Sequence, residues 1–219
     1  MTAKDRPSVG VLIVDYGLCN LDSVKRAVEQ CGAQATISDD PTAAAEATKI
    51  ILPGVGSFSD AAGRIRSAGW DVALRREALE NRIPLLGICL GMHLLADSGT
   101  EGAGGGSTQG LGLIHGKVVA LEPPDRRTRI PHIGWNEVVH GNESPLFRSI
   151  PSGKDFYFVH SYQFVPASES VVLARTPYCG EFVSVVATGS IFGTQFHPEK
   201  SQRVGLQLLK NFIELEAHA

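Results

Sequence analysis

The residue of this chain best suited to act as a nucleophile is Cys89. It stands in the segment 84–91, PLLGICLG, where an apolar run passes into Gly-x-Cys-x-Gly and then into helical sequence. A nucleophile on a sharp turn between strand and helix needs small neighbours, and Gly87 and Gly91 provide them. The N-terminus of the helix that follows favours a thiolate. The segment predicts a nucleophile elbow, and a buried structural cysteine in a tight turn is the alternative.

A base and a carboxylate that could orient it occur together near the end of the chain. The strand-like run 191–196 leads into His197-Pro198-Glu199. Side chains two positions apart on a strand share a face, so we expect His197 and Glu199 to project together while Pro198 points away. An imidazole can take the proton of a thiol, and a carboxylate can hold its tautomer. Taken alone, the motif could also be a surface turn.

A third motif, PGVG at 53–56, could stabilise negative charge on a substrate. It follows the apolar run 49–52, so it should reach the sheet edge that carries the elbow. A backbone N–H group of this loop, together with that of Leu90, could receive an oxyanion. A simple Pro-Gly turn is the alternative.

Alternating strand and helix patterns must position these three motifs. Strand-like runs lie at 8–15, 49–52, 83–88, 113–121, 135–139, 156–160, 171–174, 182–187 and 191–196, and helical patterns at 20–32, 57–68, 72–81, 92–96 and 202–216. The glycine-rich stretch 102–106 indicates a surface loop. We therefore predict an α/β fold with an open mixed, mainly parallel sheet flanked by helices, in a single domain spanning 1–219.

Composition argues against several classes of protein. The formal net charge is −3 and no basic stripe is present, so nucleic acid is not an expected partner. The start of the chain is polar and no run is long enough to cross a bilayer, which predicts a cytoplasmic protein without membrane contact. The cysteines and histidines lack the spacing of a metal site or a disulfide framework, so neither a metal nor another cofactor is expected.

Together, the segments PGVGSF, GICLGMHLL and TQFHPEKS resemble the class I, triad-type glutamine amidotransferases. Within that family, the segments DYG at 15–17, PHIGWN at 131–136 and YFVHSY at 157–162 are similar to the glutaminase subunits of imidazole glycerol phosphate synthases. The resemblance covers nearly the whole chain and implies a flavodoxin-like fold. It also implies that a Cys89-His197-Glu199 triad hydrolyses L-glutamine to glutamate and ammonia through a glutamyl thioester.

The resemblance further implies roles for residues around the triad. Backbone N–H groups of Val55 and Leu90 would form the oxyanion hole. Glutamine would be held by Gly54, Gly56, His93, Glu101, Ser161 and Tyr162. Trp135, Tyr157 and Lys200 would contact the partner. The partner would be a cyclase, a (β/α)8 barrel that uses the ammonia to form imidazole glycerol phosphate and aminoimidazole carboxamide ribotide in histidine biosynthesis.

Several positions depart from the pattern usual in this family. Cys19 stands where glycine is common, His93 where glutamine is usual and His115 where proline is common. A neutral imidazole can both donate and accept, as an amide does, so we expect His93 to replace the glutamine. The departures also fit a paralogous subunit that supplies ammonia for surface-sugar amidation. A cysteine hydrolase acting alone and a non-catalytic regulatory subunit are the remaining alternatives.

Overall fold

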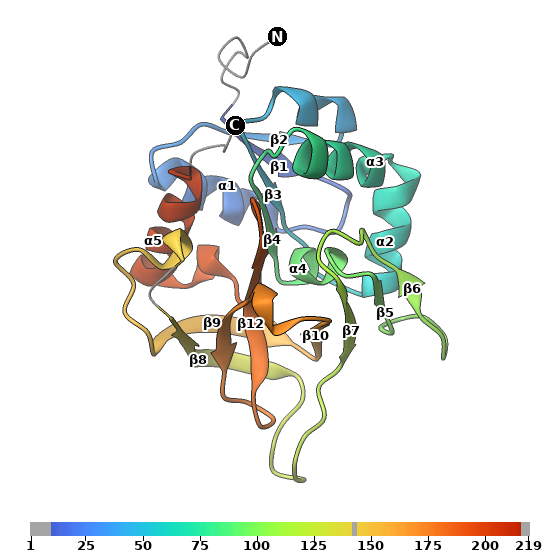
Figure 1. Ribbon diagram of the computed structural model, residues 1–219, viewed down its shortest axis with the longest axis vertical. Coiled ribbons are helices and arrows are strands. Elements are labelled where there is room, and N and C mark those ends of the chain that lie inside the picture. The colour runs from blue at the N-terminus through green and yellow to red at the C-terminus, as the bar shows by residue number, and fades with distance from the viewer. Residues whose placement is uncertain (1–9, 142–143, 216–219) are drawn as a thin grey trace.

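A nine-stranded sheet forms the centre of the computed structural model, which describes residues 10–141 and 144–215 (Figure 1). Its strand order is β2-β1-β3-β4-β13-β12-β11-β8-β9. The strands are β1 (Val11–Val14), β2 (Ala35–Ser38), β3 (Lys49–Leu52), β4 (Leu85–Ile88), β8 (His132–His140), β9 (Lys154–His160), β11 (Val172–Thr176), β12 (Phe182–Thr188) and β13 (Ile191–Thr194). From β2 to β13 they pair in parallel, and from β13 to β9 antiparallel. The parallel part has the strand order of flavodoxin-like folds, which confirms the predicted fold class.

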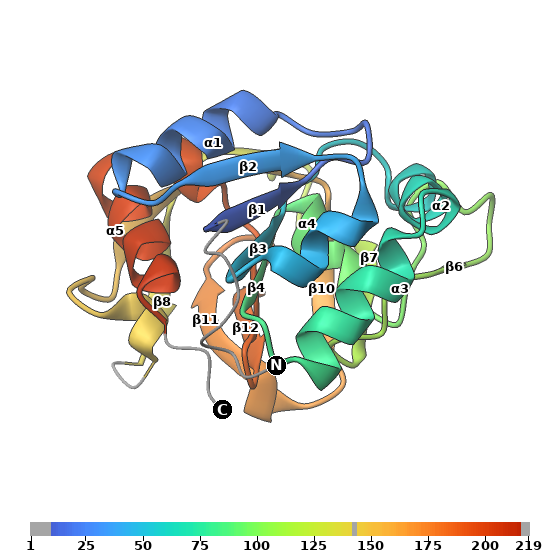
Figure 2. The same cartoon turned by 90° about the horizontal axis from the view of Figure 1, so that it is seen from above.

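Helices cover both faces of the parallel strands (Figure 2). The helices are α1 (Leu21–Gln30), α2 (Phe58–Ser67), α3 (Trp70–Arg75), α4 (Leu90–Leu94) and α5 (Gln202–Ile213). Ile13 and Ile51 pack with α1 and α5 on one face, whereas Leu12 and Ile50 pack with α2, α3 and α4 on the other. Because both of their faces are buried, the inner strands β1, β3 and β4 are almost entirely apolar and show no polar alternation. The single-domain organisation stays a prediction.

A smaller sheet stands beside α4. Its strand order is β10-β7-β5-β6, and its strands are β5 (Ser98–Gly99), β6 (Thr108–Gln109), β7 (Gly116–Ala120) and β10 (Tyr162–Pro166). The glycine-rich stretch 102–106 forms mostly exposed turns between β5 and β6, which confirms the predicted surface loop. This sheet places β10 directly after the end of β9, next to the edge where the motifs converge.

Some elements differ from the sequence-based expectation. We did not predict β2, β5, β6 and β10, which are short or lie away from the apolar centre of the large sheet. The predicted helix 72–81 is α3 followed by a π-helical turn, Arg76–Glu80. The predicted strand 191–196 ends at Thr194. Residues 1–9 and 216–219, which include the polar start and His218, lie outside the described residues.

Candidate active site

Cys89 lies on a strained turn between β4 and α4. Its backbone has φ +55° and ψ −108°, a conformation that a residue with a side chain rarely adopts. The glycines on either side are required by close packing: a Cβ at Gly87 would lie 2.6 Å from the carbonyl oxygen of Gly91, and one at Gly91 would lie 1.8 Å from that of Leu52. This is the geometry expected of an elbow that lifts a side chain above the sheet edge.

The elbow gives a direct stability test. Gly91→Ala should lower the free energy of unfolding by about 3 kcal/mol or more, because its new Cβ would overlap the β3 backbone, which cannot move without disturbing the sheet. Urea unfolding of the purified chain measures the change. Gly63→Ala is the matched control, since Gly63 lies within α2 with open space around it. It should stabilise the chain by about 0.5–1 kcal/mol, and equal effects of the two substitutions would contradict the packing argument.

Strand pairing brings the predicted base to the elbow. β4 and β13 are parallel neighbours with Ile88 opposite Thr194, and the N–H group of Cys89 donates to the carbonyl oxygen of Thr194 at 2.7 Å. Cys89 directly follows Ile88, and His197 comes three residues after Thr194. Residues far apart in the sequence therefore meet at the carboxyl end of adjacent parallel strands, as expected for a site in an open α/β sheet.

The predicted base and carboxylate form a buried pair. Nδ1 of His197 lies 2.8 Å from Oε1 of Glu199, and their side chains are 3% and 2% exposed. The sequence predicts that His197 and Glu199 share one face of a strand, but the strand does not continue to these residues. Pro198 begins a short 3-10 helix, η5 (Pro198–Lys200), and this turn brings Glu199 back to the imidazole. Proline suits the first position of such a turn because its φ is already helical and its missing N–H needs no partner.

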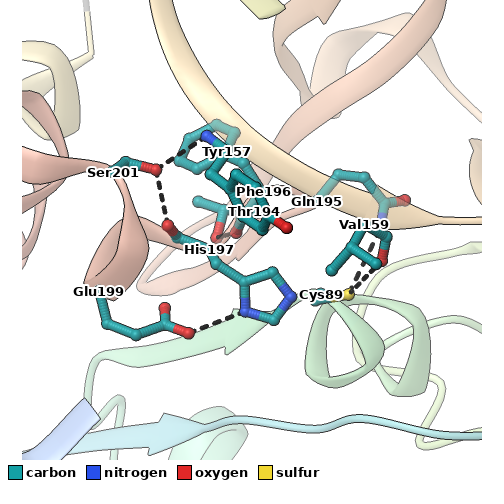
Figure 3. Close-up of polar contacts among 9 residues, drawn as sticks. All are labelled: Cys89, Tyr157, Val159, Thr194, Gln195, Phe196, His197, Glu199 and Ser201. Atoms are coloured by element: carbon teal, nitrogen blue, oxygen red, sulfur yellow. Dashed lines mark hydrogen bonds and ion pairs between the residues drawn. The ribbon is translucent and has the colours of Figure 1, made fainter. Parts of the chain in front are cut away.

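His197 points its other ring nitrogen, Nε2, toward Cys89 (Figure 3). Burial alone would lower the pKa of His197, but the charges of Cys89 and Glu199 and the hydrogen bond to Glu199 outweigh burial and raise that pKa to about 10. An imidazole with a raised pKa remains protonated at neutral pH when it faces a thiolate. An imidazolium at this position faces the sulfur of Cys89 and would stabilise the thiolate, which is the reactive form of a cysteine nucleophile.

A cavity of about 190 Å³ opens in front of this pair. Cys89 and His197 line it, as do both residues expected to form the oxyanion hole and five of the six expected to hold glutamine. The sixth, Gly54, does not line the cavity. It packs against Tyr16, since a Cβ on Gly54 would lie 2.2 Å from the Tyr16 hydroxyl. The cavity has the liquid volume of about six water molecules, which suits a single amino acid better than a protein segment.

Only one of the two expected oxyanion donors is free of a backbone partner. Leu90 is the first residue of α4, where an N–H group has no acceptor within the helix. The N–H group of Val55 instead donates to the carbonyl oxygen of Leu18 at 2.9 Å. In this conformation, the peptide between Gly54 and Val55 is therefore turned toward Leu18.

His93 and a glutamine that the sequence analysis did not single out lie beside the nucleophile. Nε2 of His93 is 2.8 Å from Oε1 of Gln195, and Nε2 of Gln195 is 3.9 Å from Sγ of Cys89. Burial lowers the pKa of His93 to about 4, so its ring is neutral at physiological pH. The sequence did contain a signal for Gln195, because a polar side chain in the apolar run 191–196 must find a partner when buried.

Glu101 reaches the cavity from the segment between β5 and β6. Its Oε2 accepts a hydrogen bond from the N–H group of Phe58, at the start of α2, at 3.0 Å. Burial raises the pKa of Glu101, and this hydrogen bond opposes the rise. One carboxylate oxygen is therefore used to cap a helix, and the second is left for another donor.

The residues expected at a partner interface lie near one another on β8, β9 and η5. Trp135 and Tyr157 face each other across the β8-β9 pair, with ring centroids 6.0 Å apart in an edge-to-face arrangement. Trp135 is 47% exposed, and Ile133 and Val139 on the same face of β8 are 60% and 48% exposed. Exposed apolar side chains on one face of a strand, here with the exposed Glu137 between Trp135 and Val139, are typical of a protein-protein interface.

His132, His160 and Cys19 have structural surroundings. His132 and His160 are linked by a 2.9 Å hydrogen bond, and His160 also bonds the carbonyl oxygen of Tyr162. Burial raises the pKa of Cys19 to about 11, which agrees with an unreactive thiol. Within 10–141 and 144–215, no group of three or more metal-binding side chains is arranged to hold an ion. No helix in the same ranges is long and apolar enough to cross a bilayer.

Comparison with protein families matches residues 12–215 to glutamine amidotransferase class-I. The chain is 47% identical over 209 residues to the imidazole glycerol phosphate synthase subunit HisH of Moorella thermoacetica, covering 95% of this chain and 96% of the relative. It is 46% identical over 205 residues to the subunit of that name from Geobacillus kaustophilus, covering 92% and 94%.

Solved structures agree on the fold. A crystal structure described as a glutamine amidotransferase superposes with a TM-score of 0.72 at 21% identity, covering 94% of this chain and 98% of that chain. PurLQS from Thermotoga maritima gives a TM-score of 0.70 at 19% identity, covering 94% and 97%. At such identities the likeness supports the fold alone.

Proposed function

The chain belongs to the class-I glutamine amidotransferase family, and from this premise we propose that it is the glutaminase subunit of an imidazole glycerol phosphate synthase. The observation that carries the proposal is that Cys89 and His197 line one small cavity at the sheet edge, while Glu199 bonds the far side of the His197 ring. The relatives that bear this name are similar along nearly their whole length, which supports the same role for this chain.

The geometry supports the following reaction. The Cys89 thiolate attacks the side-chain amide carbon of glutamine, and the carbonyl electrons move onto the oxygen. When the C–N bond breaks, the imidazolium of His197 gives its proton to the leaving nitrogen, and ammonia departs. His197, now neutral, takes a proton from water, which attacks the glutamyl thioester. Glutamate leaves, the thiolate is restored, and Glu199 holds the imidazole orientation throughout.

The cavity walls supply groups for recognising glutamine. The ammonium group of the substrate would meet the free carboxylate oxygen of Glu101, and its carboxylate would meet backbone near Ser161 and Tyr162. Gly56 and His93 would border its side chain. Each of these residues lines the same cavity as Cys89.

The ammonia would pass to a cyclase subunit with a (β/α)8 barrel. We place the docking face around Trp135, Tyr157 and Lys200, because the two aromatic rings are close together and the cation lies on η5, next to the triad. An interface beside the active site would shield ammonia from protonation in bulk water. The reaction belongs to histidine biosynthesis, and we place it in the cytoplasm.

Reconstitution tests this function. We expect the purified chain, combined with the cyclase of the same organism, its phosphorylated ribulosyl nucleotide and glutamine, to form imidazole glycerol phosphate and one glutamate per product. Chromatography of the nucleotide products and an enzymatic glutamate assay measure both. Glutamate formation without the imidazole product would favour an amidotransferase for another acceptor, such as a surface sugar. No glutamate under any condition would favour a non-catalytic regulatory subunit.

A further inference from the structure

A buried amide connects the helix after the nucleophile with the nucleophile itself. Nε2 of His93 lies 2.8 Å from Oε1 of Gln195, and Nε2 of Gln195 lies 3.9 Å from Sγ of Cys89. Figure 3 shows Gln195 beside Cys89. The geometry points to Gln195 as the donor of a hydrogen bond that stabilises the Cys89 thiolate, and to His93 as a positioning residue that orients the Gln195 amide. The inference rests on the proposed function, because it concerns the same thiol.

The direction of both hydrogen bonds follows from the donors available. A thiolate only accepts, so the NH2 group of Gln195 must face Cys89. The amide oxygen then faces His93 and, being an acceptor, requires a proton on Nε2 of that ring. A neutral imidazole carries only one ring proton, so Nδ1 of His93 has none. The two hydrogen bonds therefore run in one direction, from His93 to Gln195 and from Gln195 to Cys89.

Burial keeps this arrangement fixed. Gln195 is fully buried, His93 is 3% exposed, and the backbone N–H group of Gln195 donates to the carbonyl oxygen of Ser184 on β12 at 2.9 Å. If the amide rotated by half a turn, its oxygen would face the thiolate and its NH2 group would face the N–H group of His93. With the ring proton on Nε2, both contacts would be repulsive around a fully buried amide. The thiolate therefore sets the amide orientation, and the Nε2–H group of His93 holds it.

Other titratable side chains near Cys89 act differently. His197, from the turn between β13 and η5, supplies positive charge, while His160, from β9, has a pKa lowered to about 3 by burial and is neutral. Burial raises the pKa of Tyr16, which follows β1, so its phenol is neutral as well. The amide is therefore a neutral donor that adds to the charge of His197. Removing the Gln195 amide should make the thiolate of Cys89 less stable without removing its ion pair with His197.

The test is the pH dependence of Cys89 alkylation by iodoacetamide, followed by mass spectrometry of the peptide that contains Cys89. Gln195→Met keeps the buried volume and removes the donor, and we expect it to raise the midpoint of the alkylation profile by about one pH unit. Gln207→Met is the matched control, because the amide of Gln207 bonds Asn211 within α5 at 2.9 Å. That control should leave the midpoint unchanged.

Substitutions of His93 give a second, independent measurement. His93→Leu should raise the midpoint by less than Gln195→Met does. His93→Gln should keep the wild-type midpoint, because an amide at this position can donate to Gln195. Unchanged midpoints in both Gln195→Met and His93→Leu would overturn the proposal, and the His93 pair decides alone if Gln195→Met does not fold. If the midpoints shift as expected but the wild-type chain never hydrolyses glutamine, the proposed function fails and this inference stands.

Discussion

Replacing Cys89 with alanine should abolish glutamine-dependent synthesis by the complex and leave ammonia-dependent synthesis intact. In the proposed mechanism the Cys89 thiolate forms the covalent bond to the glutamyl carbon, and no other described thiol lines the cavity. We therefore expect a loss of about 10⁴-fold or more. Ammonia supplied from solution bypasses that step and reaches the cyclase directly. Initial rates of imidazole product formation, with either glutamine or an ammonium salt as the nitrogen source, measure the difference.

Cys179→Ala is the matched control for this experiment. Cys179 is a free thiol of the turn before β12 and does not line the cavity. Its removal should leave both rates at the wild-type value. If Cys89→Ala removed the ammonia-dependent rate as well, the substitution would be acting on the partner or on the assembly of the complex, and Cys89 would not be assigned to glutamine hydrolysis alone.

The elbow could be predicted from sequence because its determinants are local. Gly87 and Gly91 are glycines for reasons that involve only the turn and the strand beside it, so the Gly-x-Cys-x-Gly pattern carries the structure. The meeting of His197 with Cys89 depends on which strands are neighbours. The sequence could place both residues at one edge because parallel strands end at a common edge, although the pairing of β4 with β13 could be known only from the fold.

Features set by loop conformation or by edge strands could not be predicted. The turn that brings Glu199 to His197 is a 3-10 helix. An extended strand would also place side chains two positions apart on one face, so the spacing of His197 and Glu199 does not distinguish the two conformations. Gln195 was missed because its role depends on two partners from different elements. The strands β2 and β10 have mixed polar and apolar residues, and what stabilises them is the neighbour they pair with.

The isolated chain should hydrolyse glutamine slowly, and binding of the cyclase with its nucleotide should raise turnover by about 10²-fold or more. The reason lies in Val55, whose N–H group donates to Leu18 at 2.9 Å and so is not available to an oxyanion. A partner that favours the opposite orientation of the Gly54-Val55 peptide would add a second donor beside Leu90. The measurement is kcat for glutamate release by the chain alone, with the cyclase, and with the cyclase and nucleotide.

Alkylation of Cys89 separates this explanation from a general activation of the thiol. Iodoacetamide reacts with the thiolate without forming an oxyanion, so completion of the oxyanion hole should raise glutamine turnover and leave the alkylation rate constant nearly unchanged. A parallel rise in both rates would instead mean that the partner acts on the pKa of Cys89 or on access to it. High turnover by the chain alone would show that the hydrogen bond from Val55 to Leu18 does not limit the reaction. We expect partner control to reside in the loop peptide, because strand pairing already brings Cys89 and His197 together and Glu199 already bonds His197 in the isolated chain.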